Sequence, residues 1–369
     1  MKIICSTAAL SEACQNVQRA VTQKTTIPAL EGILIAAQGN EIVLTGYDLE
    51  LGIRTAVEGK VPEEGAIVLN ARVLCDILRK MPGETVEMEA DLRFLAKIKS
   101  GEAEYSLIGI SPEEFPELPT LDKGDPVVLS QGVVKEMVRQ TIFAVSVKDS
   151  KVVHTGVKFE IQENELRLIA VDGVRLALRK EIIEYDGSEL SFVVPAKTLS
   201  EVVKLMEADD AFVSMGVGKR HIVFDISGYS VVSRLLDGDF LNYRASIPQN
   251  NSTQVTVNTR QFIDSIERTS LIITDKLKSS VKCSFEANSI HISSVTALGT
   301  ANDRILAQVS GEPLEIGFNN KYITEALRVC DSDEVKIELN GPVSPILILP
   351  TQGDNFLFLV LPVRLKTEA

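Results

Sequence analysis

One thirteen-residue pattern occurs three times in this chain, at almost constant intervals. It reads LNARVLCDILRKM at residues 69–81, VPAKTLSEVVKLM at 194–206 and FNNKYITEALRVC at 318–330. A pattern that returns over the whole length of a chain is typical of a repeated structural unit. The repeat therefore predicts three similar domains, each containing a strand end that runs into an amphipathic helix.

The three copies share the same kinds of side chain at the same places. In order, these are a base (Arg72, Lys197, Lys321), an apolar residue (Leu74, Leu199, Ile323), an acid (Asp76, Glu201, Glu325) and a second base (Arg79, Lys204, Arg328). A cation near a helix start is disfavoured by the helix dipole by roughly 0.3 kcal/mol or more. Two explanations for the first base stay open: phosphate groups that face the helix across water, or an i,i+4 ion pair such as Arg72 with Asp76 on a solvated face.

Length and turn-rich connectors divide the chain. Its 369 residues exceed the usual size of one domain, which is about 100 to 150 residues. Apolar periodicity lapses at PTLDKGDP (119–126) and at PQNNST (248–253), which are rich in turn-forming residues. We therefore predict domains at 1–122, 127–248 and 253–369.

Each third of the chain shows the same order of helix and strand periodicity. Each is expected to open with a helix, near Thr7, Leu129 and Thr259, followed by three short strands, the helix of the repeated pattern and three more strands. In the first third the expected strands are 32–37, 41–47, 51–57, 85–90, 94–100 and 104–110. Helices on one side of largely antiparallel sheets define an α+β fold. Closure into a ring, by one chain or by two chains head to tail, would remove exposed sheet edges.

The composition is that of a globular protein outside the membrane. Apolar residues make up 45% and charged residues 24%, and no apolar run approaches the roughly 20 residues that span a bilayer. The first residues lack the apolar stretch of a secretory signal, which predicts a cytoplasmic protein. Five cysteines without a CxxC spacing predict reduced, mostly buried thiols rather than disulfides or a zinc site.

The net charge of −13 argues against a nucleic-acid partner unless the charges are sorted, because binding phosphates needs local positive charge. Catalysis is not predicted either. His154, His221 and His291 are isolated, and the sequence contains no HExxH, GxSxG or P-loop motif. We predict no catalytic residues, no metal and no cofactor.

Five segments, taken in order, resemble one known family. They are TTIPALEGI (25–33), TGVKFE (155–160), VDGVRLAL (171–178), LLDGDFLNYRASIP (235–248) and FLVLPVRL (358–365). Together with the threefold repeat, they are similar to the bacterial sliding clamp, the beta subunit of DNA polymerase III. The resemblance implies an α+β DNA clamp fold of three repeated domains, with helices lining a ring and antiparallel sheets outside. It also implies a head-to-tail homodimer around duplex DNA, which would reconcile an acidic exterior with bases that face phosphates.

The resemblance further implies a processivity factor without chemistry of its own, bound to double-stranded DNA regardless of sequence. Its implied partners are the DNA polymerase III alpha subunit, a clamp loader, and other polymerases and repair proteins that carry short linear motifs. No membrane partner is implied. Two alternatives stay open: a divergent clamp paralogue, and an acidic scaffold protein that does not bind DNA.

Matching segments assign residues to these partners. The DNA-facing candidates are Met1, Lys24, Arg72, Lys148, Lys151 and Lys197. A groove for partner peptides is implied at His154, Val171, Gly173, Val174, Arg175, Leu176, Leu241, Pro345, Val360, Leu361, Pro362, Val363 and Arg364. A few apolar anchors commonly carry most of the energy of such binding. Asp172-Gly173 also predicts a hairpin turn, for which this dipeptide is favoured.

The implied dimer interface contains Tyr105, Leu107, Leu271 and Ile272. Its charges depart from the family pattern, because Glu102 and Glu104 stand where bases are usual and Arg304 lies in a region usually rich in acids. The groove departs from the family pattern at His154, Val174, Leu241 and Ala245. We therefore expect a dimer with altered ion pairs and a groove of altered shape.

Overall fold

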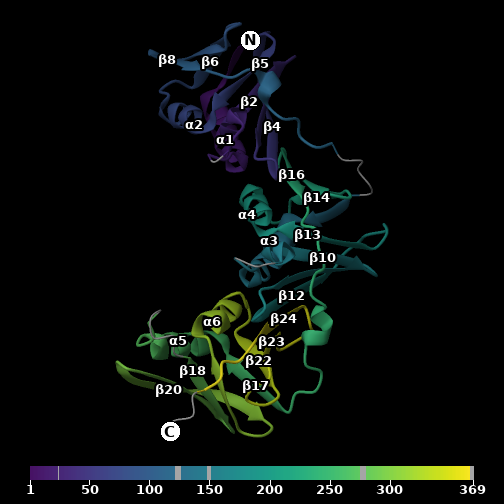
Figure 1. The fold of residues 1–369 in the computed structure, drawn as a ribbon, viewed down its shortest axis with the longest axis vertical. Helices are drawn as coiled ribbons and strands as arrows, with labels where there is room; N and C mark the ends of the chain where they lie inside the picture. Colours follow the sequence, from purple (N-terminus) through teal and green to yellow (C-terminus); the bar gives the residue numbers. More distant parts are fainter. Residues whose placement is uncertain (24, 121–125, 148–150, 275–279, 366–369) are drawn as a thin grey trace. The chain divides into compact units, whose positions relative to one another are not determined.

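A computed structural model describes residues 1–23, 25–120, 126–147, 151–274 and 280–365 (Figure 1). The chain forms two compact units. Unit 1 contains residues 1–134 and 197–235, and unit 2 contains residues 135–196 and 236–369. Within the described ranges, no helix is both long and apolar enough to span a membrane.

Unit 1 is built on a twelve-stranded antiparallel sheet. Its strands are β1 (Lys2–Ser6), β2 (Gly32–Gln38), β3 (Glu41–Tyr47), β4 (Leu51–Glu63), β5 (Gly65–Asn70), β6 (Thr85–Ala90), β7 (Leu95–Ser100), β8 (Ala103–Ile108), β9 (Val127–Ser130), β14 (Phe212–Val217), β15 (His221–Ile226) and β16 (Tyr229–Arg234). The main path runs β8-β7-β6-β1-β4-β16-β15-β14-β9, and β3 leads from β4 to β2 and β5. β4 and β16 pair from Thr55 with Tyr229 to Leu51 with Ser233. We call this pairing the first junction, because it joins the first two predicted domains.

Unit 2 is built on a second twelve-stranded antiparallel sheet. Its strands are β10 (Gly156–Gln162), β11 (Glu165–Val171), β12 (Arg175–Ile182), β13 (Leu190–Pro195), β17 (Thr253–Asn258), β18 (Val281–Glu286), β19 (Ser289–Thr296), β20 (Gly299–Ser310), β21 (Leu314–Phe318), β22 (Glu334–Leu339), β23 (Ile346–Pro350) and β24 (Phe356–Val360). Their order is β13-β10-β11-β12-β24-β23-β22-β17-β20-β19-β18-β21. β12 and β24 pair from Arg175 with Val360 to Arg179 with Phe356. This pairing, the second junction, joins the last two predicted domains.

Six α-helices occur in the part of the chain that the structure describes. They are α1 (Thr7–Val17), α2 (Ala71–Lys80), α3 (Gln131–Arg139), α4 (Ala196–Leu205), α5 (Thr259–Ser270) and α6 (Asn320–Arg328). Each follows one strand and precedes three, so the same order of elements occurs six times along the chain. This arrangement confirms the predicted α+β fold with its threefold repeat.

One expectation about the repeat is wrong. Each third does not open with a helix, because the short strands β1, β9 and β17 come first, and α3 accordingly begins at Gln131 rather than Leu129. These strands have four to six residues and run directly into a helix. Such a short alternating pattern is hard to separate by periodicity from the helix that follows.

Side-chain caps and apolar spacing explain where the helices begin and how they pack. Ser6, Asn70, Asn258 and Asn319 each precede a helix and accept a hydrogen bond from a backbone N–H in its first turn. In α2 the buried residues include Leu74, Ile77 and Leu78, at the three- and four-residue spacing of one helix face. α1 packs beside α2 in unit 1, and α5 beside α6 in unit 2 (Figure 1).

The borders of the two compact units fall inside the middle third of the chain, after Val134, Ala196 and Leu235. They differ from the predicted domain limits because each unit is held together by a sheet that crosses from one domain into the next. The limits 1–122, 127–248 and 253–369 stay predictions.

Candidate peptide groove and DNA-facing residues

Four neighbouring strands of unit 2 each contribute one apolar residue to a continuous row. Val171 of β11 pairs with Leu176 of β12, which pairs with Leu359 of β24. Leu359 in turn pairs with Leu347 of β23. All four side chains are buried in one cluster with Tyr243. Because side chains directly opposite on antiparallel strands are close neighbours, the row forms an unbroken apolar floor.

The hairpin between β11 and β12 forms one wall of this floor. Oδ1 of Asp172 accepts hydrogen bonds from the backbone N–H groups of Val174 and Arg175, both at 3.0 Å. Gly173 has φ +88°, a left-handed conformation that glycine adopts without steric cost. The predicted Asp-Gly hairpin turn is confirmed, and it leaves Val174 at the rim with 37% of its surface exposed.

The C-terminal segment lies beside the hairpin and forms the next part of the rim. Leu361 donates its backbone N–H to the carbonyl of Val174 at 2.8 Å, and Val363 donates to Gly317 at the same distance. Leu361 and Val363 are 38% and 41% exposed, although Val360 beside them is fully buried. The first bond therefore holds the segment against the hairpin, and the second holds it against β21, while the side chains of Leu361 and Val363 stay partly exposed.

The connector after β16 completes the rim, and Glu160 of β10 anchors it. Oε2 of Glu160 accepts hydrogen bonds from the hydroxyl of Tyr243 at 2.8 Å and from Arg244 at 2.9 Å. Burial, and then the hydrogen bond to Glu160, raise the pKa of Tyr243 to about 12. The anchored connector presents Leu241, which is 39% exposed. Sequence reasoning missed Glu160 and Tyr243, although both lie inside segments that carried the family resemblance.

The remaining predicted groove residues lie near this cluster or at its end. The ring of His154 packs edge-on against Phe240, with 5.6 Å between ring centroids, and Phe240 packs on the cluster. Pro345 is half-buried just before Ile346, which pairs with Val360. Pro362 is half-buried and Arg364 exposed in the C-terminal segment. The structure thus brings the predicted apolar residues together as a partly exposed apolar strip.

Arg175 is held by contacts with several elements of unit 2. Its Nε donates to Oδ2 of Asp172 at 2.7 Å, and its Nη1 donates to Oε2 of Glu325 on α6. The guanidinium carbon lies 4.6 Å from the ring centroid of Tyr322 and 5.6 Å from that of Phe143. Only 10% of the side chain is exposed, so the guanidinium is a packed part of the wall.

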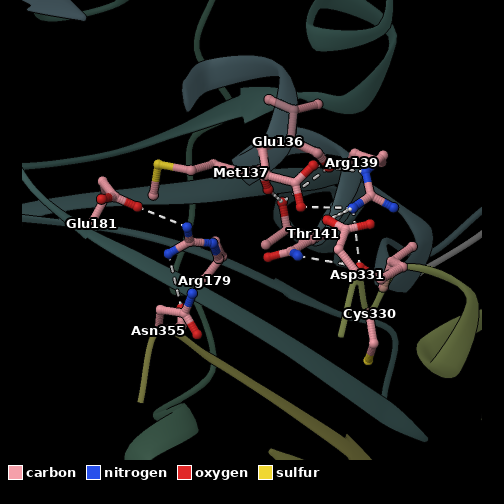
Figure 2. Close-up of polar contacts among 12 residues, drawn as sticks. Glu136, Met137, Arg139, Thr141, Arg179, Glu181, Cys330, Asp331 and Asn355 are labelled. Carbon is pink, nitrogen blue, oxygen red and sulfur yellow. Dashed lines mark hydrogen bonds and ion pairs between the residues drawn. The ribbon is translucent and has the colours of Figure 1, made fainter. Parts of the chain in front are cut away.

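Two further arginines brace the second junction (Figure 2). Nη2 of Arg139, at the end of α3, lies 2.5 Å from Asp331 and donates to the carbonyl of Val329 at 3.1 Å. Arg179 of β12 donates to Glu181 at 2.7 Å and to the carbonyl of Asn355 at 3.1 Å. Arg139 thereby caps the end of α6, where a cation also complements the helix dipole.

The DNA-facing candidates have different surroundings. Arg72 is exposed in the first turn of α2, and Asp76 pairs with Arg79 at 3.2 Å rather than with Arg72. Nζ of Lys197 lies 2.5 Å from Oδ2 of Asp48, a carboxylate that is 8% exposed.

The other candidates are terminal or lie in loops. Met1 is buried, and its amino group binds Glu63 and the carbonyl of Ala90, both at 3.1 Å. Lys151 is exposed. Lys24 and Lys148 lie outside the described residues. The assignment of this group to DNA stays a prediction.

Charge is unevenly distributed between the helices and the rest of the chain. The six helices contain eleven Lys or Arg and seven Asp or Glu, which is a net charge of +4. The whole chain carries −13, so the residues outside these helices carry −17. The sorting of charge that a DNA partner would require is therefore present at the level of secondary structure.

The predicted interface residues lie on or near sheet edges. Tyr105 and Leu107 are on β8, the last strand of its sheet, and Tyr105 is 41% exposed. Leu271 follows α5 and is 82% exposed, while Ile272 is half-buried. The first part of β20 pairs with β19 only, because its pairing with β17 begins at Ala307. Both regions offer backbone groups that another strand could pair with.

The cysteine thiols are buried. All five cysteines are free and buried, as predicted. Burial raises the pKa of the Cys283 thiol to about 12, which keeps it protonated and unreactive near neutral pH. Among the described residues, no group of three or more His, Cys, Asp or Glu side chains is placed to hold a metal ion.

Comparison with known proteins covers the whole chain. Family models of the DNA polymerase III beta subunit match residues 1–119 (N-terminal domain), 128–242 (central domain) and 244–364 (C-terminal domain). A beta sliding clamp from Bacillus subtilis is 34% identical, over 99% of this chain and 100% of the relative. One from Staphylococcus epidermidis is 34% identical, over 94% of each chain.

Solved structures give the same result. The DNA polymerase sliding clamp from Bacillus subtilis matches with a TM-score of 0.97 and 33% identity, over 99% of this chain and 100% of that one. The DNA polymerase III beta subunit from Thermotoga maritima matches with a TM-score of 0.91 and 27% identity, over the same shares of the two chains. Six copies of a strand, a helix and three strands, on sheets that cross domain borders, are the architecture of a DNA clamp. The chain belongs to the DNA polymerase III beta subunit family, the bacterial sliding clamps.

Proposed function

We propose that this chain acts as a DNA sliding clamp, in which two copies form a head-to-tail ring around duplex DNA. The ring would tether the DNA polymerase III alpha subunit and other replication and repair proteins as a non-catalytic processivity factor, without a cofactor, in the cytoplasm. The observation that carries the proposal is the charge of +4 on the helices against −17 elsewhere. Binding that ignores base sequence depends on bases gathered toward the phosphates.

The test of this function is topological. After loading onto nicked circular DNA by a clamp loader, the protein should stay bound to the circle and leave once the circle is cut. Free sliding predicts this result, because no base-specific hydrogen bond holds the protein in place. Retention on the linear product would contradict sliding.

For the partner groove, we propose the apolar floor with its rim of Val174, Leu241, Leu361 and Val363. Such a surface suits a short peptide with Leu or Phe anchors. A variant with Leu176→Ala and Leu361→Ala should lose about tenfold or more in affinity for a peptide with such anchors. Leu298→Ala is a matched control, because Leu298 is an exposed leucine of unit 2 outside the cluster. Equal affinity in the double variant and the control would refute the groove.

For the dimer, we propose that the edge of β8 pairs with the free part of the β20 edge of a second copy. Tyr105, Leu107, Leu271 and Ile272 would supply the apolar contact. Arg304 lies 3.3 Å from Glu286 within its own chain, so the dimer would depend on apolar area more than on ion pairs. Sedimentation at several salt concentrations should give a dimer mass throughout. A monomer at all concentrations would contradict ring closure.

The alternative of an acidic scaffold that does not bind DNA is not favoured, because the relatives that match over almost the whole chain are sliding clamps. Ion pairs such as Lys204 with Glu201 at 2.8 Å and Arg328 with Glu267 at 2.7 Å leave the helices with their net positive charge. A scaffold of this kind would not load onto circular DNA at all. A clamp would load, with a yield that falls as salt rises.

A further inference from the structure

Helix α6 differs from its counterparts α2 and α4 in what its acidic residue contacts. The acid of the repeated pattern pairs with the second base of its own helix in α2, where Asp76 meets Arg79 at 3.2 Å, and in α4, where Glu201 meets Lys204 at 2.8 Å and also lies 3.9 Å from Arg19. In α6, Glu325 binds Arg175 of the groove wall instead. Arg328, the second base of α6, pairs with Glu267 of α5 at 2.7 Å. The third copy therefore directs its carboxylate toward the groove.

The contacts of Arg175 enclose its guanidinium. Asp172 occupies Nε, Glu325 occupies Nη1, and the ring of Tyr322 lies 4.6 Å away. Asp172 and Tyr322 come from different elements, the β11–β12 turn and α6. Two carboxylates beside one guanidinium leave a local charge of −1 at a wall whose rim is otherwise apolar. A peptide carboxylate that approached Arg175 would meet the negative charge of Asp172 and Glu325, which already occupy Nε and Nη1.

Helix α6 is also linked to the C-terminal segment, through the strand that precedes it. β21 runs directly into α6, and Gly317 near its end accepts the hydrogen bond from Val363 at 2.8 Å. The hairpin and the C-terminal segment are joined to each other by the bond from Leu361 to Val174. Helix α6 and the strand before it are therefore connected to both parts of the rim, to the hairpin through Glu325 and to the C-terminal segment through Gly317.

We propose that Glu325 and Tyr322 are positioning residues of the peptide groove. They hold Arg175 so that the hairpin keeps its place beside Leu361, and they keep that guanidinium away from partner carboxylates. This inference rests on the proposed function of the groove. It predicts that partner peptides are selected by their apolar anchors and that an acidic residue beside the anchors adds no affinity.

The test uses the full-length protein and a peptide with Leu and Phe anchors, in versions that place Glu or Gln at each flanking position. Wild type should bind the Glu and Gln versions about equally. Glu325→Gln should bind the Gln versions about threefold to tenfold more weakly and should favour Glu over Gln at one position, because one side of Arg175 is released. Glu201→Gln makes the same change at the same repeat position in α4 and should behave as wild type.

A second variant separates positioning from simple loosening. In an Arg175→Gln background, Glu325→Gln should cause no further change, because the two residues act as one pair. The inference is overturned if Glu325→Gln binds every peptide as Glu201→Gln does, or if it weakens Glu and Gln versions equally. It is also overturned if the two substitutions weaken binding additively. Failure of wild type to bind any anchored peptide would instead overturn the proposed groove itself.

Discussion

The first and second junctions share one backbone arrangement and differ in their side chains. Asp48 opens its turn as Asp172 does, with one carboxylate oxygen that accepts two backbone N–H groups. Arg234 donates its N–H to the carbonyl of Glu50 at the first junction, and Leu361 donates to Val174 at the second, both at 2.8 Å. The hydrogen bonds that join neighbouring domains therefore belong to the repeat and do not by themselves create a groove.

The side chains at matching positions explain why only the second junction is proposed to bind peptides. Gly52 of the first junction, which pairs with Tyr47, corresponds to Leu176, which pairs with Val171. The chain's own Leu118 covers Gly52, so that a Cβ at residue 52 would lie 2.4 Å from Cδ2 of Leu118. At the first junction, a side chain of the same chain therefore already occupies the place next to Gly52.

The rim of the first junction is charged, whereas the rim of the second is apolar. Glu50 and Arg234 at the first junction correspond to Val174 and Leu361 at the second, and all four are exposed. A charged rim keeps its water, whereas an apolar rim gains free energy when a partner covers it. The comparison shows how a binding site can arise on a shared joint through a few side-chain changes.

The largest effect is expected when the second junction receives the glycine of the first. Leu176→Gly removes a side chain that is 97% buried and adds backbone freedom to the unfolded chain, so the free energy of unfolding should fall by about 3 to 5 kcal/mol. Urea denaturation measures the change. Leu176→Met keeps the volume and should cost less than about 1.5 kcal/mol. Similar losses of unfolding free energy in both variants would show that burial of the Leu176 side chain does not determine the stability of this row.

The reciprocal change should be smaller. Gly52→Leu places a side chain against Leu118, and forcing it aside should destabilise unit 1 by about 1 to 3 kcal/mol. Leu118→Ala added to Gly52→Leu should restore part of the loss, because it removes the obstructing atoms. A double variant less stable than Gly52→Leu would mean that Leu118 is not the obstacle. Thermal unfolding of the single and double variants decides between these results.

A pH titration should report how the connector after β16 is anchored at the second junction. Tyr243 of the second junction has a folded-state pKa of about 12 against 10.0 for the ordinary side chain, because it is buried and bonded to Glu160. The folded state therefore keeps a proton that the unfolded state loses, and stability should fall as pH rises from about 10 toward 12.

Tyr243→Phe removes this titration, so wild type should lose about 1 to 2 kcal/mol relative to the variant over that range. Both proteins keep the same buried thiols, which also titrate at alkaline pH. Parallel stability curves for the two proteins between pH 9 and 12 would contradict the assignment.

The smallest effect is expected at the turns. Gly173 and Leu49 occupy the same place in the two hairpins, with φ of +88° and +73°. Gly173→Ala meets no atom within 4 Å, so it should cost the left-handed strain less the freedom that alanine removes from the unfolded chain, a net loss of about 0.5 to 1 kcal/mol. Gly228 is the matched comparison, because it has a similar φ of +81° and equally open space around its Cβ. Gly228→Ala should therefore cost about as much as Gly173→Ala. A neutral Gly173→Ala would show that the turn relaxes.

Much of the fold could be predicted from the sequence because helices and strands depend on the pattern of residues that are near one another in the chain. The spacing of Leu74 and Leu78, and the alternation in segments such as 32–37 and 41–47, report which face of a helix or strand is buried. The Asp172-Gly173 pair also indicates a turn from local residues alone, because glycine adopts the positive φ that the turn requires. The strands β1, β9 and β17 could not be predicted, since they are too short for their period to stand out.

The candidate site was only partly predictable. The apolar row from Val171 to Leu347 requires four strands in register, and register depends on partners that are far apart in the chain. The partner of Lys197 was not predictable either, because Asp48 is 149 residues away. Ion pairs at such separations leave no periodic signal.

The sequence by itself determined the threefold repeat, the helices and most strands, the reduced thiols and the family, because each of these depends on local pattern or on ordered motifs. Only the tertiary structure decided that the acid of the third repeat holds Arg175, that Leu118 covers Gly52 and that Lys197 meets Asp48. These pairings depend on which distant strands lie side by side, and that is fixed by packing of the whole sheet rather than by neighbours along the chain.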